Sequence, residues 1–129
     1  MTPITVRVRI YFGSTLAIGP GRIELLEGVQ RTGSLSQAAR DMDMSYRRAW
    51  LLMQSLNDSL RSPAAIAVRG GRRGGGATVT PIGRALIQAY RRTEARVGRN
   101  VSTRFAKFAR AATGTSRAAD RVRAPTRKG

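Results

Sequence analysis

The fold is decided by residues 31–57, RTGSLSQAARDMDMSYRRAWLLMQSLN. Gly33 is the kind of residue that ends a helix, because glycine adopts the left-handed conformation of a C-cap without strain. Ser34 and Gln37 form the S-x-x-Q pattern of a capping box, which predicts a second, short helix that begins here and ends near Asp43. The stretch therefore holds the end of one helix, a complete second helix and, after a turn, the start of a third.

The third helix follows a turn of four residues, MDMS (42–45). Ser45 can cap this helix, and Ser62-Pro63 ends it shortly after Leu60. One face of the helix is apolar and consists of Ala49, Leu52, Met53, Leu56 and Leu60. The opposite face consists of Arg47, Leu51, Gln54 and Asp58, with Arg48 and Trp50 on its flanks. Two helices joined by so short a turn are typical of a helix-turn-helix.

Upstream of this stretch, the sequence predicts a strand, a turn and the first helix. Residues 4–12, ITVRVRIYF, alternate apolar and polar side chains, which indicates a half-buried strand. Gly13 and Ser14 suit a turn, after which TLAI (15–18) can return as a short second strand. Pro20 is tolerated at the first position of a helix. The apolar stripe of that helix is Ile23, Leu26 and Val29.

Downstream, the sequence AIAVRGGRRGGGATVTP predicts a hairpin. Its strands lie around 65–69 and 77–80, and the glycine-rich segment GGRRGGG (70–76) joins them. Thr80 and Pro81 suit the N-cap and first position of a fourth helix. The core side of that helix is predicted to carry Leu86, Tyr90 and Val97.

These elements together predict a winged helix-turn-helix, mainly α with a small β component. It has a three-helix core, an N-terminal strand or hairpin, a Gly-rich wing and a C-terminal helix. We expect this domain to occupy residues 1–98. Residues 99–112 are predicted to form a basic amphipathic helix, which either continues the apolar stripe of the fourth helix or is separated from it by a break near Gly98. Residues 113–129 are predicted to be a basic, disordered tail.

The composition favours binding over catalysis. The 24 Lys+Arg residues outnumber the 7 Asp+Glu residues, so the formal charge is +17, and there is no His or Cys. The commonest general base, thiol nucleophiles and Cys-based metal sites are thereby excluded. We therefore predict no enzyme activity, no metal and no cofactor. The charge instead predicts a polyanionic partner, although biased codon usage can also raise the arginine content.

No run of about 18 apolar residues occurs, so a membrane-spanning helix is not expected. The N-terminus also lacks the apolar core of a signal peptide. The sequence thus predicts a cytoplasmic protein that is associated with the nucleoid through DNA, and no membrane partner.

The third helix is predicted to read bases in the major groove of double-stranded DNA. The side chains that we expect to face DNA are Ser45, Tyr46, Arg47, Arg48, Leu51 and Gln54. Arg47 is suited to pair with guanine and Gln54 with adenine, while Leu51 or Tyr46 can touch a thymine methyl group. Ser34, Ser36 and Gln37 are expected to contact phosphates. The alternative is that these side chains form a helix face that contacts only solvent. For Trp50 we favour packing or dimer contacts over DNA contact.

The Gly-rich segment does not match a nucleotide-binding loop. A P-loop requires Gly-x4-Gly-Lys-Ser/Thr, whereas Ala77 and Thr78 follow Gly76 here. As a wing, the segment makes chemical sense, because glycine allows close approach of the backbone and arginine contacts phosphates or the minor groove. The wing residues expected to contact DNA are Arg69, Arg72 and Arg73. A solvent-exposed hairpin tip is the alternative.

Three motifs together resemble a known family. The GS-x-S-x-AA segment, the SY-x-x-AW start of the third helix and the Gly-rich loop leading into an L/V-T-x-x-G motif are similar to the DNA-binding domain of the ModE family of molybdate-responsive regulators. IGPGRIELLE (18–27) also fits, and the resemblance covers roughly residues 4–97. The first motif alone also resembles LysR-type regulators.

The resemblance implies a homodimer that binds a palindromic operator and regulates transcription, with dimer contacts by the N-terminal and fourth helices. It places Ser45, Tyr46, Arg47 and Arg48 at the DNA-facing start of the recognition helix, and it suggests a connection to molybdenum uptake genes. ModE regulators sense molybdate in small β-barrel domains that follow the DNA-binding domain. Residues 99–129 are rich in Ala and Arg without strand alternation, so we expect a stand-alone form that binds no molybdate.

Two other functions remain open at this point. An architectural protein that coats DNA with little sequence preference would also carry a high positive charge. A protein-interaction module would instead present Trp50 and Leu51 to another chain. The 99–112 helix is also compatible with a membrane surface.

Overall fold

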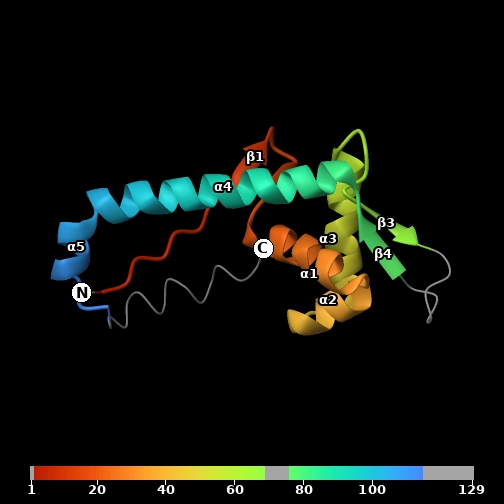
Figure 1. Cartoon of the computed structure of the whole chain (residues 1–129), viewed down its shortest axis with the longest axis horizontal. Helices are drawn as coiled ribbons and strands as arrows, with labels where there is room; N and C mark the ends of the chain where they lie inside the picture. The colour runs from red at the N-terminus through yellow and green to blue at the C-terminus, as the bar shows by residue number, and fades with distance from the viewer. Residues whose placement is uncertain (1, 69–75, 115–129) are drawn as a thin grey trace. The chain divides into compact units, whose positions relative to one another are not determined.

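The computed structural model describes residues 2–68 and 76–114 of the chain (Figure 1). It divides the chain into two compact units, of which the larger is Arg7–Ala95. The smaller unit combines the N-terminal residues up to Val6 with the chain from Arg96 onward. The division predicted from sequence, with boundaries at residues 98 and 112, stays a prediction. The wing arginines and nearly all of the predicted tail lie outside the described residues.

A short hairpin opens the larger unit. β1 (Ile10–Phe12) and β2 (Leu16–Ile18) pair antiparallel, with Ile10 opposite Ile18. The strand predicted over 4–12 was too long, because β2 offers only three residues to pair with before helix α1 begins. Val8 lies outside the ladder and still packs against the core, where its carbonyl accepts a hydrogen bond from the Tyr90 hydroxyl.

Three helices form the centre of the larger unit: α1 (Pro20–Thr32), α2 (Leu35–Asp41) and α3 (Tyr46–Ser59). Figure 1 shows them packed together as a cluster. Gly33 ends α1 in the left-handed conformation predicted for it, with φ of 71°, and donates a 2.7 Å hydrogen bond to Val29 O. Gly28 allows α1 and α2 to pack closely, since a Cβ there would lie 2.8 Å from the Ala38 Cβ.

The second hairpin and the fourth helix follow. β3 (Ala65–Val68) and β4 (Gly76–Val79) pair antiparallel, and α4 (Pro81–Arg104) begins directly afterwards. Thr80 caps α4 as predicted, because its Oγ1 accepts a 3.2 Å hydrogen bond from the Gly83 amide. A Cβ at Gly83 would overlap the Ala64 carbonyl oxygen and lie 2.7 Å from Val79 Cγ1, so this helix start requires glycine.

The core of the larger unit draws on α1 to α4 and on both hairpins. The fully buried large side chains are Ile18, Ile23, Leu25, Leu26, Val29, Leu56 and Tyr90. Sequence periodicity identified most of them, but it missed Leu25 and also Ile87, which is buried on α4. Val97, predicted on the core side, belongs instead to the smaller unit and lies outside this core.

The smaller unit contains the end of α4, the short helix α5 (Ala106–Ala111) and the first residues of the chain. The Thr2 amide donates a 3.2 Å hydrogen bond to Ala109 O, which attaches the N-terminal segment to α5. The helix break predicted near Gly98 is wrong, since α4 continues through that residue to Arg104 and is interrupted at Phe105. A glycine inside a helix costs only about 1 kcal/mol, which the flanking hydrogen-bonded turns can offset.

Candidate nucleic-acid interface

The start of α3 is built as the sequence predicts. The Ser45 side chain caps the helix by accepting a 3.1 Å hydrogen bond from the Arg48 amide. Ala49, Met53 and Leu56 are buried on the inner face, and Leu52 and Leu60 pack partly against the core. This anchoring fixes the rotation of the helix, so the side chains of its outer face are held in the solvent.

The predicted base-reading side chains share this exposed surface. Tyr46 is 54% exposed and Leu51 is 49% exposed, which is unusual for residues of this size. Arg47 and Gln54 are also exposed, and Arg47 and Arg48 line a surface hollow together with Leu51. The surface thus combines cations, an amide and apolar groups, which are the side-chain types that read base edges.

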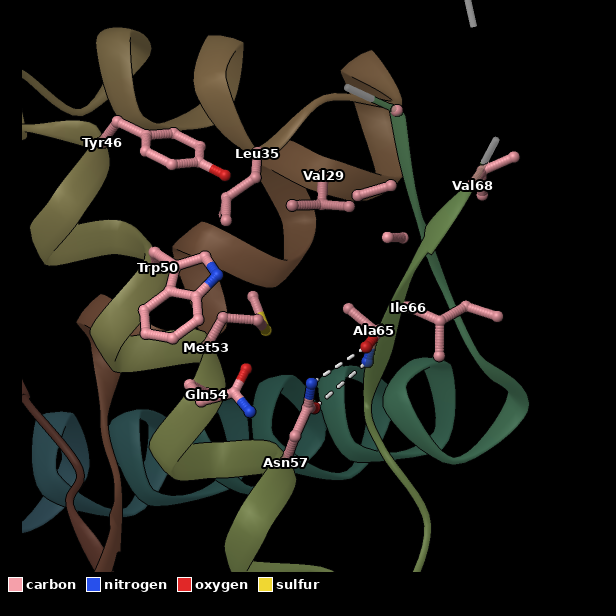
Figure 2. Close-up of a pocket in the computed structure, with 13 residues that line it drawn as sticks. Val29, Leu35, Tyr46, Trp50, Met53, Gln54, Asn57, Ala65, Ile66 and Val68 are labelled. Atoms are coloured by element: carbon pink, nitrogen blue, oxygen red, sulfur yellow. Dashed lines mark hydrogen bonds between the residues drawn. The ribbon is translucent and has the colours of Figure 1, made fainter. Parts of the chain in front are cut away.

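A groove of about 350 Å³ lies between α3 and the β3–β4 hairpin (Figure 2). Tyr46 and Trp50, one turn apart on α3, form one wall, and Ile66 and Val68 of β3 form the other. Trp50 is 44% exposed at this groove rather than buried in the core. Its predicted role in packing or dimer contacts stays a prediction.

Asn57 connects α3 to the first residues of β3. Its Oδ1 accepts a 2.8 Å hydrogen bond from the Ala64 amide, and its Nδ2 donates a 2.9 Å hydrogen bond to Ala65 O. Figure 2 shows the Asn57 side chain directed at the strand. The hairpin is thereby held at a defined place beside α3. Sequence periodicity did not reveal this residue, because its role depends on a segment eight positions away.

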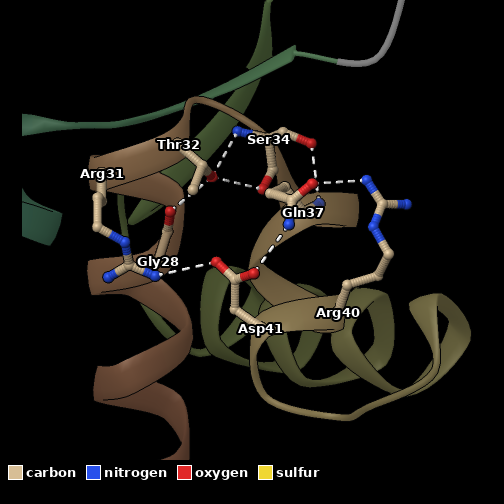
Figure 3. Close-up of polar contacts among 7 residues, drawn as sticks. All are labelled: Gly28, Arg31, Thr32, Ser34, Gln37, Arg40 and Asp41. Carbon is tan, nitrogen blue, oxygen red and sulfur yellow. Dashed lines mark hydrogen bonds and ion pairs between the residues drawn. The ribbon is translucent and has the colours of Figure 1, made fainter.

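The start of α2 differs in one respect from the predicted capping box. The Ser34 Oγ accepts a 3.0 Å hydrogen bond from the Gln37 amide, as expected. The Gln37 side chain does not return to Ser34; its Nε2 donates to Asp41 Oδ1 at 2.8 Å, as Figure 3 shows. The Ser34 amide instead donates to Thr32 Oγ1 at 3.2 Å, so the donor that Gln37 was expected to satisfy already has an acceptor.

Two arginines complete this polar cluster. Arg40 donates to Gln37 Oε1 at 2.8 Å and to Ser36 Oγ at 3.2 Å, while Arg31 pairs with Asp41 at 3.2 Å. The hydrogen bond from Gln37, followed by that from Arg31, holds the pKa of the Asp41 carboxyl below its usual range. The structure therefore gathers Ser34, Ser36 and Gln37 with Arg40, which sequence reasoning did not single out. Its position three residues after Gln37 and four after Ser36 was the available signal.

The hairpin stem lies beside this cluster. The Ala77 amide of β4 donates a 2.9 Å hydrogen bond to Gly33 O, and Ser34 forms a bridge with Gly76. The wing residues Arg69, Arg72 and Arg73 follow β3 but lie outside the described residues, so their expected contacts stay predictions. The described stem nevertheless connects the predicted wing to the helix-turn-helix.

Other arginines serve the fold. Arg91 on α4 forms a bidentate pair with Glu27 on α1, at 2.7 and 2.9 Å, and also bonds Glu94 at 2.7 Å. These hydrogen bonds, Glu27 first, raise the pKa of Arg91. Burial lowers the pKa of Arg22, whose guanidinium donates to Ala17 O and Ser55 Oγ. Arg91 thus links α4 to α1, and Arg22 on α1 contacts both β2 and α3.

Residues 2–68 and 76–114 contain no group of three or more His, Cys, Asp or Glu side chains that could hold a metal ion. Within the same ranges, no helix combines the length and apolar character needed to cross a bilayer.

No family model matches the chain, but several curated proteins do. MopB of Rhodobacter capsulatus, named a molybdenum-pterin-binding protein, is 44% identical over 86 residues, which cover 67% of this chain and 32% of MopB. ModE of Azotobacter vinelandii, named a molybdenum transport protein, is 38% identical over 60% of this chain and 29% of its own. ModE of Escherichia coli (strain K12), named a DNA-binding transcriptional dual regulator, is 39% identical over 55% of this chain and 27% of its own. The chain spans about a third of the length of the curated relatives it matches.

A solved structure, the DNA-binding domain of CbnR in complex with DNA, has a similar fold. The TM-score is 0.51 with 22% sequence identity, and the match covers 67% of this chain and 94% of the CbnR domain. This likeness confirms the predicted fold class, a mainly helical winged helix-turn-helix with small two-stranded sheets.

Proposed function

We propose that this chain is a sequence-specific regulator of transcription that binds double-stranded DNA through α3 and the β3–β4 wing. The observation that carries the proposal is the exposed outer face of α3, where Arg47, Gln54 and Leu51 stand on a helix fixed by its buried opposite side. Large exposed apolar side chains such as Tyr46 and Leu51 are more typical of an interface than of a helix face that contacts only water. The names of the matched regulators support the same class of function.

The proposed division of labour separates base contacts from phosphate contacts. Arg47 donates two hydrogen bonds to guanine, and Gln54 pairs with adenine. Leu51 and Tyr46 contact thymine methyl groups, while Ser45 and Arg48 lie at the start of α3, next to the DNA backbone. Phosphate contacts come from the cluster around α2 and from the wing, through the side chains of Ser34, Ser36, Gln37, Arg69, Arg72 and Arg73. These contacts make affinity depend steeply on salt.

The proposal includes a homodimer on a palindromic site. Two copies related by a two-fold axis place two recognition helices about one helical turn of DNA apart, which matches an inverted repeat. The proposal assigns binding rather than catalysis to this chain and no cofactor, molybdate included. A connection to molybdenum uptake genes follows from the relatives' names and is part of the proposal.

Replacing Arg47 with alanine tests the proposed base reading. We expect discrimination to fall by about 1–3 kcal/mol at one base-pair position in each half-site. Affinity for random DNA should fall much less. The matched control is Arg61→Ala, which removes one exposed arginine from the segment after α3 and should leave discrimination unchanged. If Arg47→Ala weakens binding to all sequences equally, Arg47 is a phosphate contact and the assigned role is wrong.

An architectural DNA-binding protein is the second candidate, and the formal charge of +17 favours it. Such a protein coats DNA through phosphates and shows a flat response to sequence. The apolar residues of the α3 face count against it, because they gain nothing from phosphates. A comparison of affinities across randomised duplexes separates the two candidates.

A further inference from the structure

The smaller unit carries a row of cations without a carboxylate partner. Between Ala95 and Ala119 the sequence contains no Asp or Glu. On the last turns of α4, five exposed side chains border one shared surface hollow, and we call them the α4 basic stripe: Arg96, Arg99, Asn100, Thr103 and Arg104. At 100° per residue, all five fall on one side of the helix.

Helix stability explains only part of this stripe. Arg104 lies in the last turn of α4, where a cation interacts favourably with the helix dipole. That effect falls off within one turn, so it does not reach Arg96 or Arg99. Like charges three positions apart destabilise a helix by a few tenths of a kcal/mol. Arg96 and Arg99 therefore weaken the isolated helix that carries them.

Neither arginine has a structural partner among the described residues. Their counterparts in the larger unit do: Arg91 holds Glu27 and Glu94, and Arg31 holds Asp41. In the smaller unit, Lys107 lies 5.2 Å from the centre of the Phe108 ring. The guanidinium groups of Arg96 and Arg99 make no ion pair or hydrogen bond in the described part of the chain, and both residues are exposed.

We propose that the α4 basic stripe is a second DNA-binding surface, which contacts phosphates without reading bases. Guanidinium groups bind phosphate through two parallel hydrogen bonds, a geometry that ammonium groups lack. The stripe extends about 12 Å along the helix axis, and a duplex carries several phosphates in that length. This inference extends the proposed function, but it concerns a different unit of the chain and requires no sequence preference.

The alternative polyanion is an anionic membrane. Basic amphipathic helices lie on such surfaces when a continuous apolar face accompanies the cations. Here the helix is interrupted at Phe105, and the apolar hollow formed by Val101, Phe105 and Phe108 is shared with Pro3 and Ile4 of the N-terminal segment. The apolar face of the stripe's own helix is thus short and partly occupied by this chain, which favours DNA.

The test is the salt dependence of binding to a random-sequence duplex. The full chain, the variant R96Q/R99Q and the control R7Q/R61Q are compared between 50 and 200 mM salt. Both variants remove two exposed arginines, and glutamine preserves the helix of the stripe. Circular dichroism confirms that each variant is folded.

We expect R96Q/R99Q to reduce the slope of log K against log salt by about 1.8, since each lost phosphate contact contributes about 0.9. The advantage of the unmodified chain over this variant then shrinks about twelvefold from 50 to 200 mM salt. The control should change the slope by less than about 0.5. An unchanged slope in R96Q/R99Q, or an equal fall in the control, overturns the proposal.

Two further measurements distinguish phosphate contacts by the α4 basic stripe from base reading by α3 and from membrane binding. R96Q/R99Q should keep the ratio of affinities between a selected sequence and random DNA, whereas Arg47→Ala should lower it. If no sequence preference exists, base reading by α3 fails while the stripe can still be supported by its slope. Vesicles of phosphatidylcholine with phosphatidylglycerol are the last probe. Loss of vesicle binding in R96Q/R99Q with an unchanged DNA slope overturns DNA as the partner.

Discussion

Asn57→Ala should weaken the larger unit more than any exposed substitution on α3. The Asn57 side chain makes hydrogen bonds of 2.8 and 2.9 Å with the backbone of Ala64 and Ala65. Ala64 is fully buried and Ala65 nearly so, so water cannot replace the lost partner without rearrangement. The substitution leaves the Ala64 amide without its acceptor at the point where the chain enters β3.

The expected cost follows from the two bonds. A buried donor without a partner costs about 1–3 kcal/mol, and a hydrogen bond contributes about 1 kcal/mol net. We therefore expect a loss of about 2–4 kcal/mol in the free energy of unfolding. The assay is unfolding in urea, followed by the fluorescence of Trp50, the only tryptophan, which lines the groove beside Asn57. The m-value should not change, because the same surface is exposed on unfolding.

The control is Asp58→Ala at the neighbouring, exposed position of α3. Exposed substitutions of this kind change stability by at most about 0.5 kcal/mol. A loss below about 0.5 kcal/mol in Asn57→Ala would refute the reasoning, since the hairpin would then be held in place by other contacts. Asn57→Ala should also bind DNA more weakly than the unmodified chain, because the β3–β4 hairpin loses hydrogen bonds that hold it beside α3.

Three more outcomes are expected. Gly83→Ala should destabilise the fold by about 3 kcal/mol in urea unfolding, because the new Cβ would overlap a buried carbonyl oxygen. At Gly98 a Cβ meets nothing within 4 Å, so Gly98→Ala should stabilise α4 by about 0.5–1 kcal/mol. Equal effects of the two substitutions would contradict the close packing at the start of α4. Arg91→Ala should lower the free energy of unfolding by about 1 kcal/mol through the loss of the ion pair with Glu27. The loss should be smaller in 1 M salt, because both side chains are about a third exposed and salt screens their attraction. A loss that does not depend on salt would indicate lost packing instead. Because the pKa of the Asp41 carboxyl is lowered in the folded state, this carboxylate stabilises the fold above about pH 4, and the stabilisation is lost as the pH falls through the native pKa. Asp41→Asn should therefore flatten the dependence of stability on pH below about pH 4. An unchanged acid limb in the titration would show that the ion pair contributes nothing.

Local signals predicted the caps of three helices. Gly33 ends α1, Ser45 caps α3 and Thr80 caps α4, each through a hydrogen bond between residues at most four positions apart. Such contacts are encoded by short motifs, so a single sequence reveals them. The apolar faces of α1 and α3 were predicted for the same reason, because helical periodicity depends only on spacing.

Contacts between distant segments were not predictable in the same way. Alternation over residues 4–12 indicated a long strand, but strand length depends on the partner, and β2 offers three residues. One local contact was also missed: Gln37 matched the capping-box motif, but its side chain bonds Asp41 on the same helix, and the Ser34 amide donates to Thr32 Oγ1 instead. Asn57 carried no motif, and its role emerged only from the position of β3.

Selection of genomic DNA fragments by the purified chain tests the central claim most directly. The fragments are bound at near-physiological salt, recovered and sequenced. Base reading by a dimer predicts a small set of fragments that share an inverted repeat, with half-sites about one helical turn apart. Arg47→Ala should lose the preference at one position of each half-site. Uniform recovery across the genome would contradict sequence-specific regulation and favour an architectural protein.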